Sequence, residues 1–259
     1  MCLQIFYRIL KEIVDEVLLS ADHIFIDSTH VKASANKRKF DKKMVRKETR
    51  AYEEKLQEEL NIDREKNGKK PFPKEKFEKE ECKEIKESTT DPESGYYVKD
   101  ERTKQFAYSF HAATDERGFV LGAIVTPGNI HDSHILQPLV EKVIEKVKKP
   151  LAVAADAAYK TPAITNFLLE NQMLPVLPYT RPKTKDGFFR KHDYVYDEHN
   201  DCYICPNDQT LSYVTTTKEG YRQFKSNPTI CANCPFLKQC TESKNHTKLI
   251  QRHIWEAYV

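Results

Sequence analysis

The sequence predicts a mixed α/β fold, in which helices pack on a sheet that has both parallel and antiparallel strands. Three observations support this class. Two apolar runs of strand length end in an acid, at Asp27 and at Asp156. An antiparallel hairpin is expected between these runs, and segments with a one-sided apolar stripe follow the hairpin and the second run.

The N-terminal third of the chain begins with an expected helix and strand. Residues 3–19 carry apolar side chains at helical spacing, which predicts an amphipathic helix. The run from Ile24 to Val31 is rich in β-formers, and we expect a strand that ends near Lys32. Residues 34–90 are dominated by charged side chains, and we interpret them as a solvated, helical charged insertion. A basic cluster that could contact phosphates lies at its start and consists of Lys37, Arg38, Lys39, Lys42 and Lys43.

The predicted hairpin covers residues 106–126. Its two strands flank the turn Asp115–Gly118, whose residues have the chemistry of a tight connection. After the hairpin, Asp132 or Ser133 is expected to cap a helix, because short polar side chains satisfy the first free N–H groups.

The remaining elements of the sheet region alternate between strand and helix. Residues 151–156 read as a buried strand that ends in an acid. A helix is expected from about Pro162 to Asn171, and residues 174–177 are the last expected strand.

Composition excludes several classes of protein. The 259 residues fit one large domain or two modest ones, and 42 basic against 39 acidic side chains give a net charge of only +3. A polycationic tail protein is therefore excluded, and any nucleic-acid contact must come from local clusters of charge. No apolar run approaches the ~20 residues that cross a bilayer, and no signal peptide is evident. We therefore expect a cytoplasmic protein without a membrane partner, whose seven cysteines are kept reduced.

Asp27 and Asp156 are candidate metal ligands. Each acid sits late in an apolar run that we expect to be a central strand. Two such acids on neighbouring strands could lie at one edge of the sheet, and Mg²⁺ prefers such carboxylate oxygens. A pair of ions ~4 Å apart can activate a nucleophile and stabilise the leaving oxygen in phosphodiester chemistry. The alternative is that each aspartate only caps a turn at the end of its strand.

Four segments resemble motifs of one enzyme family. Residues 24–33 are similar to the first-aspartate motif of bacterial insertion-sequence transposases of the DDE class, in the insertion-sequence-4-like group. Residues 153–159 resemble the second-aspartate motif, and residues 91–96 and 127–133 resemble two segments between them. The resemblance implies a ribonuclease H-like fold, Mg²⁺ or Mn²⁺, and DNA as partner at transposon ends and target. It also implies cutting and joining of DNA strands, and a homo-oligomer in the full-length family.

The resemblance assigns roles to single residues. Asp27 and Asp156 are the first two catalytic, metal-binding members of the acidic triad. His131, Asp132 and Tyr159 are expected as active-site neighbours. Lys32, in the first motif, is an expected DNA-binding residue. Apart from the resemblance, Arg181 and Lys183 belong to a short basic loop that could contact DNA, and the alternative is an ordinary surface loop.

The third acid of the family is a glutamate on a helix that follows an inserted region. Residues 252–258 resemble the stretch that precedes this helix, so we expect a fragment, truncated at both ends and inactive alone. The alternatives are a non-catalytic DNA-binding remnant, or a ribonuclease H-like nuclease that uses Glu256 as its third acid. A remnant of an N-terminal helical region (1–20) and the start of a missing C-terminal part (251–259) would flank the core at 21–180 and a cysteine-rich insertion at 190–250.

The cysteine-rich insertion predicts a structural zinc site. Two C-x₂-C pairs and one further cysteine are Cys202, Cys205, Cys231, Cys234 and Cys240. Tetrahedral zinc takes four thiolates, and an all-cysteine shell leaves no open position for catalysis. We expect Cys205, Cys231, Cys234 and Cys240 to bind Zn²⁺, with Cys202 as the substitute. The alternative is a set of free, buried thiols.

Overall fold

The computed structural model describes residues 2–15, 20–46, 53–73, 82–179 and 183–256. The chain divides into two units. The first unit comprises residues 1–51 and 80–179, with 258–259, and the second unit comprises residues 52–79 and 180–257.

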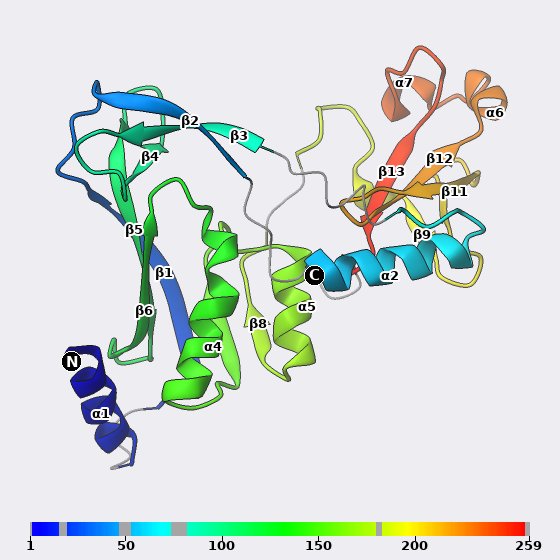
Figure 1. The fold of residues 1–259 in the computed structure, drawn as a ribbon. Coiled ribbons are helices and arrows are strands. Elements are labelled where there is room, and N and C mark those ends of the chain that lie inside the picture. Colours follow the sequence, from blue (N-terminus) through cyan, green and yellow to red (C-terminus); the bar gives the residue numbers. More distant parts are fainter. Residues whose placement is uncertain (1, 16–19, 47–52, 74–81, 180–182, 257–259) are drawn as a thin grey trace. The chain divides into compact units, whose positions relative to one another are not determined.

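An eight-stranded sheet forms the first unit (Figure 1). Its strands run in the order β2-β3-β4-β5-β1-β7-β8, and β6 pairs with the second half of β5. The pairs β1–β7 and β7–β8 are parallel, and the other pairs are antiparallel. The strands are β1 (His23–Lys32), β2 (Phe40–Arg46), β3 (Cys82–Ser88), β4 (Gly95–Val98), β5 (Lys104–Thr114), β6 (Val120–Pro127), β7 (Ala152–Ala155) and β8 (Leu174–Val176). This mixed sheet confirms the predicted α/β class and is consistent with a ribonuclease H-like fold.

Three helices contribute to the apolar core of the first unit. They are α1 (Cys2–Asp15), α4 (Leu136–Lys146) and α5 (Pro162–Glu170). Leu10, Leu139 and Leu168 bring one helix each into the same cluster as Ile24 and Ile26 of β1. Each fully buried aliphatic side chain contributes about 1.5–3 kcal/mol. This burial confirms the expected helices, although residues 16–19 of the first one lie outside the described residues.

The charged insertion is helical only in part, because Phe40–Arg46 and Cys82–Ser88 are strands of the sheet. They pair from Phe40 opposite Ser88 to Arg46 opposite Cys82. Lys42 lies 2.9 Å from Glu84, and Lys43 lies 2.9 Å from Glu87. The helical prediction was wrong for these strands because alternating opposite charges suit an exposed antiparallel pair as well as a helix surface. Two members of the predicted basic cluster are thus paired with acids.

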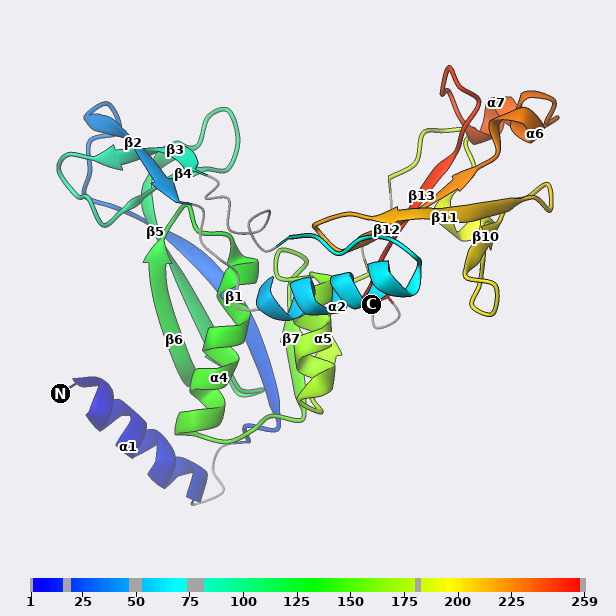
Figure 2. The same ribbon diagram turned by 45° about the vertical axis from the view of Figure 1, so that its right-hand side comes forward.

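The helical part of the insertion, α2 (Glu53–Lys66), belongs to the second unit. There it lies beside β11 in a five-stranded antiparallel sheet of order β13-β12-β11-β10-β9 (Figure 2). These strands are β9 (Val195–Asp197), β10 (Cys202–Ile204), β11 (Thr210–Thr216), β12 (Tyr221–Ser226) and β13 (Leu249–His253). A small core supports the sheet and contains Tyr194, Tyr203, Leu211, Phe224 and Ile250.

The limits of the second unit differ from the expected ones. The expected boundary between residues 250 and 251 falls inside β13, which pairs with β12 from Leu249 to His253. Residues 251–253 therefore belong to this sheet, and the segment from 52 to 79 of the insertion is part of the second unit. Among the residues that the structure describes, no helix is long and apolar enough to cross a membrane.

Candidate functional site

The parallel register of β1 and β7 brings Asp27 and Asp156 to the same level of the sheet. The last paired residues are Ile26 and Ala155, and each acid is the residue that follows. Both acidic residues are exposed. Asp27 lies within β1, whereas Asp156 directly follows the end of β7. Since neighbouring parallel strands lie ≈ 4.8 Å apart, the backbones of the two acids are close neighbours.

Each carboxylate is oriented by a backbone group of the turn or strand that follows it. Asp27 Oδ1 accepts a hydrogen bond of 2.8 Å from the N–H of Ser28. Asp156 Oδ1 accepts one of 3.0 Å from the N–H of Ala158. Among the described residues, the second oxygen of each carboxylate takes part in no hydrogen bond, so both remain for a ligand. Exposed, oriented carboxylate oxygens of this kind fit a hard divalent cation.

Asp132 lies near these acids rather than at a helix cap. His131 caps the short 3₁₀ helix Asp132–His134 by accepting from the N–H of Ser133, and α4 starts at Leu136 without a side-chain cap. The expectation that Asp132 or Ser133 caps the helix is therefore wrong. The carboxylate of Asp132 instead accepts a hydrogen bond of 2.9 Å from the hydroxyl of Ser28 in β1.

A buried histidine and tyrosine extend this network. His111 of β5 lies with Nδ1 3.0 Å from the hydroxyl of Tyr159 and Nε2 3.2 Å from the hydroxyl of Thr126. The same Nδ1 is 3.9 Å from Asp132 Oδ1. His111 and Tyr159 are both 0% exposed, so these contacts replace the water that their polar atoms lose.

Burial controls the protonation of both groups. It raises the pKa of Tyr159, and the negative charges of Asp132, Asp156 and Asp27 raise it further, against a hydrogen bond from Ser28. The pKa of His111 is lowered by burial, which outweighs the attraction of Asp132. At neutral pH the site therefore contains a phenol and an uncharged imidazole, so one ring nitrogen of His111 must act as an acceptor.

Three of the other expected site residues are exposed, namely Lys32, His131 and Lys183. His131 is bonded to Ser133 at the surface, and Lys32 ends β1 opposite Ala107. Lys183 is exposed, and Arg181 lies outside the described residues. No role for Ser28 or His111 was predicted from the sequence. A histidine that alternates with small residues in an apolar strand was the available signal for His111.

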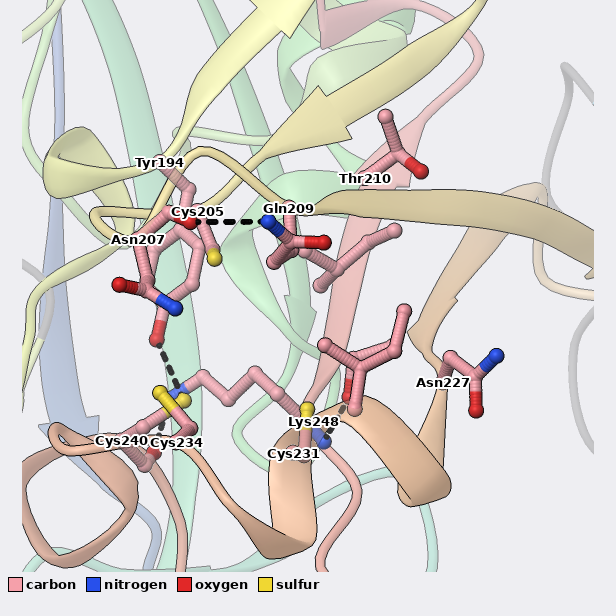
Figure 3. Close-up of a pocket in the computed structure, with 13 residues that line it drawn as sticks. Tyr194, Cys205, Asn207, Gln209, Thr210, Asn227, Cys231, Cys234, Cys240 and Lys248 are labelled. Carbon is pink, nitrogen blue, oxygen red and sulfur yellow. Dashed lines mark hydrogen bonds between the residues drawn. The ribbon is translucent and has the colours of Figure 1, made fainter.

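The predicted cysteine ligands meet in one pocket of the second unit. Cys205, Cys231, Cys234 and Cys240 line it together with Tyr194 and Lys248 (Figure 3). Cys202 is buried in β10 and does not line this pocket.

The cysteines of the pocket are reduced. The five cysteines from Cys202 to Cys240 are free. Cys240 Sγ lies 3.2 Å from the hydroxyl of Tyr194, and Lys248 donates a 3.0 Å hydrogen bond to the carbonyl of Cys240. Burial raises the pKa of the Cys240 thiol. Across the described part of the chain, no three His, Cys, Asp or Glu side chains are gathered closely enough to hold a metal ion.

Comparison with known proteins identifies the family. No curated protein and no solved structure matches the chain. A family model described as "Transposase DDE domain" matches residues 19–229, which include both acids and most of the second unit. A second model with the same description matches residues 204–259. The chain therefore belongs to the family of DDE-class transposase domains.

Proposed function

We propose that the chain acts in DNA transposition, as a domain that cleaves and joins DNA strands with divalent metal ions held by Asp27 and Asp156. DDE transposase domains generally use such ions. The observation that carries the proposal is the β1–β7 register, which brings the two acids to one level of the sheet. Two acids at unrelated levels of the sheet could not share a metal ion.

The residues of the site have separate tasks in this proposal. The outer carboxylate oxygens of Asp27 and Asp156 would hold Mg²⁺ or Mn²⁺, while the N–H groups of Ser28 and Ala158 keep the inner oxygens in place. When bound, the ions supply activation of a water or 3′-hydroxyl and stabilisation of the leaving oxygen. Tyr159 stays protonated and can donate a hydrogen bond but not accept a proton.

DNA at the transposon ends and at the target is the proposed partner, in the cytoplasm and with a homo-oligomer as the acting form. The proposed phosphate contacts are Lys32, Arg181 and Lys183. Lys32 and Lys183 are exposed cations, and a phosphate group can be bound at the surface without a pocket. With a net charge of +3, binding must depend on such local contacts, and it should weaken as salt concentration rises.

Glu256 is not part of this proposal. Its carboxylate forms an ion pair with Lys191 and accepts a 3.0 Å hydrogen bond from the N–H of His253, so it stabilises the end of β13. We therefore propose that Glu256 is not the third acid.

Metal binding tests the acidic site without relying on cleavage. We expect the chain to bind Mn²⁺, measured by electron paramagnetic resonance titration. Asp27→Ala and Asp156→Ala should each weaken binding at least ~10-fold, because each removes a ligand. Glu116→Gln, in the exposed hairpin turn, is the matched control and should bind as the wild type does. Unchanged Mn²⁺ affinity in both aspartate variants would refute the proposal.

We further propose that the cysteine pocket takes a structural Zn²⁺. Four of the five clustered thiols line this pocket, in the numbers that tetrahedral zinc requires. Among the described residues these side chains are not gathered closely enough to hold an ion, so zinc binding would have to draw them together.

Elemental analysis of protein purified without chelator tests the zinc site. We expect about one Zn²⁺ per chain, since a Cys₄ shell is a closed site for one ion. Cys205→Ser should lose it, whereas Cys202→Ser, outside the pocket, should retain it. Less than half an equivalent of zinc in the wild type would end the proposal.

A further inference from the structure

A buried polar network lies directly behind Asp27. Successive residues of a strand point to opposite faces of the sheet. Ser28 is paired with His111, and both side chains are on the face that also carries the buried residues Ile24 and Ile26. Asp27 is paired with Ala112 and is on the opposite face. The candidate site is thus on one face, and its polar neighbours are on the covered face.

Packing alone does not account for this network. Burying a hydroxyl or an imidazole costs free energy unless its hydrogen bonds are satisfied, and an apolar pair would fill the same space without that cost. The bonds that satisfy Ser28, His111, Asp132 and Tyr159 join four separate segments: β1, β5, the segment before α4 and the turn after β7.

Both acids are bonded to residues of this network. Ser28 donates its hydroxyl to Asp132 and its backbone N–H to Asp27 Oδ1. On the neighbouring strand, Tyr159 bonds through its hydroxyl to His111 and donates its backbone N–H to the carbonyl of Asp156, at 3.2 Å. Each acid therefore has a partner whose side chain is fixed on the covered face.

We propose that Asp132 is a positioning residue of the acidic site, which acts by holding Ser28, and that the Tyr159–His111 pair does the same for the turn of Asp156. The inference rests on the proposed function, because it assumes that Asp27 and Asp156 bind metal. Partners that orient metal ligands typically change metal affinity by 10–100-fold when removed.

Mn²⁺ titration of the full chain tests the inference. We expect Asp132→Ala and Ser28→Ala each to weaken Mn²⁺ binding ~10–100-fold. The double variant should be no weaker than either single one, because both remove the same hydrogen bond. Asp132→Asn should restore affinity close to the wild type, since its amide oxygen still accepts from Ser28. Tyr159→Phe should weaken binding as well, and Glu116→Gln is the control.

The outcomes separate this inference from the proposed function. If Asp27→Ala abolishes Mn²⁺ binding while Asp132→Ala leaves it unchanged, the positioning role is refuted and the acidic site stands. Additive losses in the double variant, or an Asp132→Asn variant as weak as Asp132→Ala, also refute it, because charge and not the hydrogen bond would then be responsible. Absence of Mn²⁺ binding in the wild type would refute both proposals. Thermal unfolding of each variant shows that binding is compared between folded proteins, and Ser28→Ala replaces Asp132→Ala if the latter does not fold.

Discussion

His253 is buried in the second unit in its neutral form. Its Nδ1 accepts a 3.1 Å hydrogen bond from the N–H of Trp255, which requires an unprotonated nitrogen. Burial lowers the pKa of His253, against the opposing effects of the Glu219 backbone and the charge of Glu256. A protonated ring would lose this bond and place a charge in an apolar environment.

The free energy of unfolding should therefore fall in mild acid. The unfolded chain takes up a proton at His253 near its ordinary pKa of ~6.5, whereas the folded chain does so only at lower pH. The stabilisation is complete above about pH 6.5 and is lost as pH falls through the lowered pKa of the folded state. Urea unfolding between pH 7.5 and 5.5, monitored in β12 and β13 by hydrogen exchange, measures this. His253→Gln should flatten the profile, and the exposed His199→Gln should not; equal slopes in both variants would contradict the assignment.

At the scale of single residues, the sequence pointed to the two acids but not to the contacts around them. Asp27 and Asp156 stood out because an acid directly after an apolar run would be costly if it were buried without a partner, and the structure leaves both exposed. Asp132 was identified from the sequence, but the predicted role as a helix cap was wrong. The same short carboxylate suits a helix cap and an acceptor for a donor that is distant in the sequence. The donor to Asp132 is Ser28, which lies 104 residues away in the sequence. The two residues meet through the pairing of strands, which a local sequence pattern does not reveal.

Among the elements, β4 lies close against the turn after β6, because Gly95 has no side chain to keep the two apart. A Cβ on Gly95 would lie 2.2 Å from Asn129 Oδ1 and 2.6 Å from the backbone nitrogens of Gly128 and Asn129. Backbone atoms cannot move aside as a flexible side chain does. Gly118 in the hairpin differs, because a Cβ there would meet nothing within 4 Å and only its φ of +84° resists substitution.

Gly95→Ala should consequently lower the free energy of unfolding more than Gly118→Ala. Overpacking of a closed site costs about 1–3 kcal/mol or more, against about 1 kcal/mol for a residue held at positive φ. Urea denaturation of both variants beside the wild type makes the comparison. A Gly95→Ala protein as stable as the wild type would show that β4 is free to shift.

Local patterns predicted most elements of the first unit. The hairpin, α5 and the strands before or around the two acids have turn residues, a Thr-Pro start or an apolar run that identify them directly. The strands β2 and β3 were not found, because their stability comes from pairing with each other and not from their own composition.

On the scale of the molecule, the second unit is built from two separate stretches of chain. Arg222 of β12 is an important link between them: its Nε lies 3.1 Å from Asp63 of α2, and its guanidinium also pairs with Asp201. The side chain of Arg222 is only 13% exposed, so its charge depends on these partners. Asp63 also accepts a hydrogen bond from Thr216.

Removing this link should destabilise one unit selectively. Asp63→Ala leaves the buried guanidinium short of a partner, and breaking such a pair typically costs about 3–5 kcal/mol. Hydrogen exchange should therefore speed up in β11 and β12 and stay unchanged in β5. Asp186→Ala, exposed in the same unit, is the control. Equal acceleration in both units would mean that they unfold together.

The position of α2 in the chain also bears on the order of events during synthesis. Asp63 meets Thr216 across 153 residues, and translation proceeds at roughly 5–20 residues per second. The α2 segment therefore leaves the ribosome roughly 10–30 s before the strand that it covers, while much of the large sheet is made in between. During that interval the side chains of α2 that are buried in the finished unit, Leu56 and Leu60, lack their partners, and pausing of translation within residues 67–210 would prolong this state.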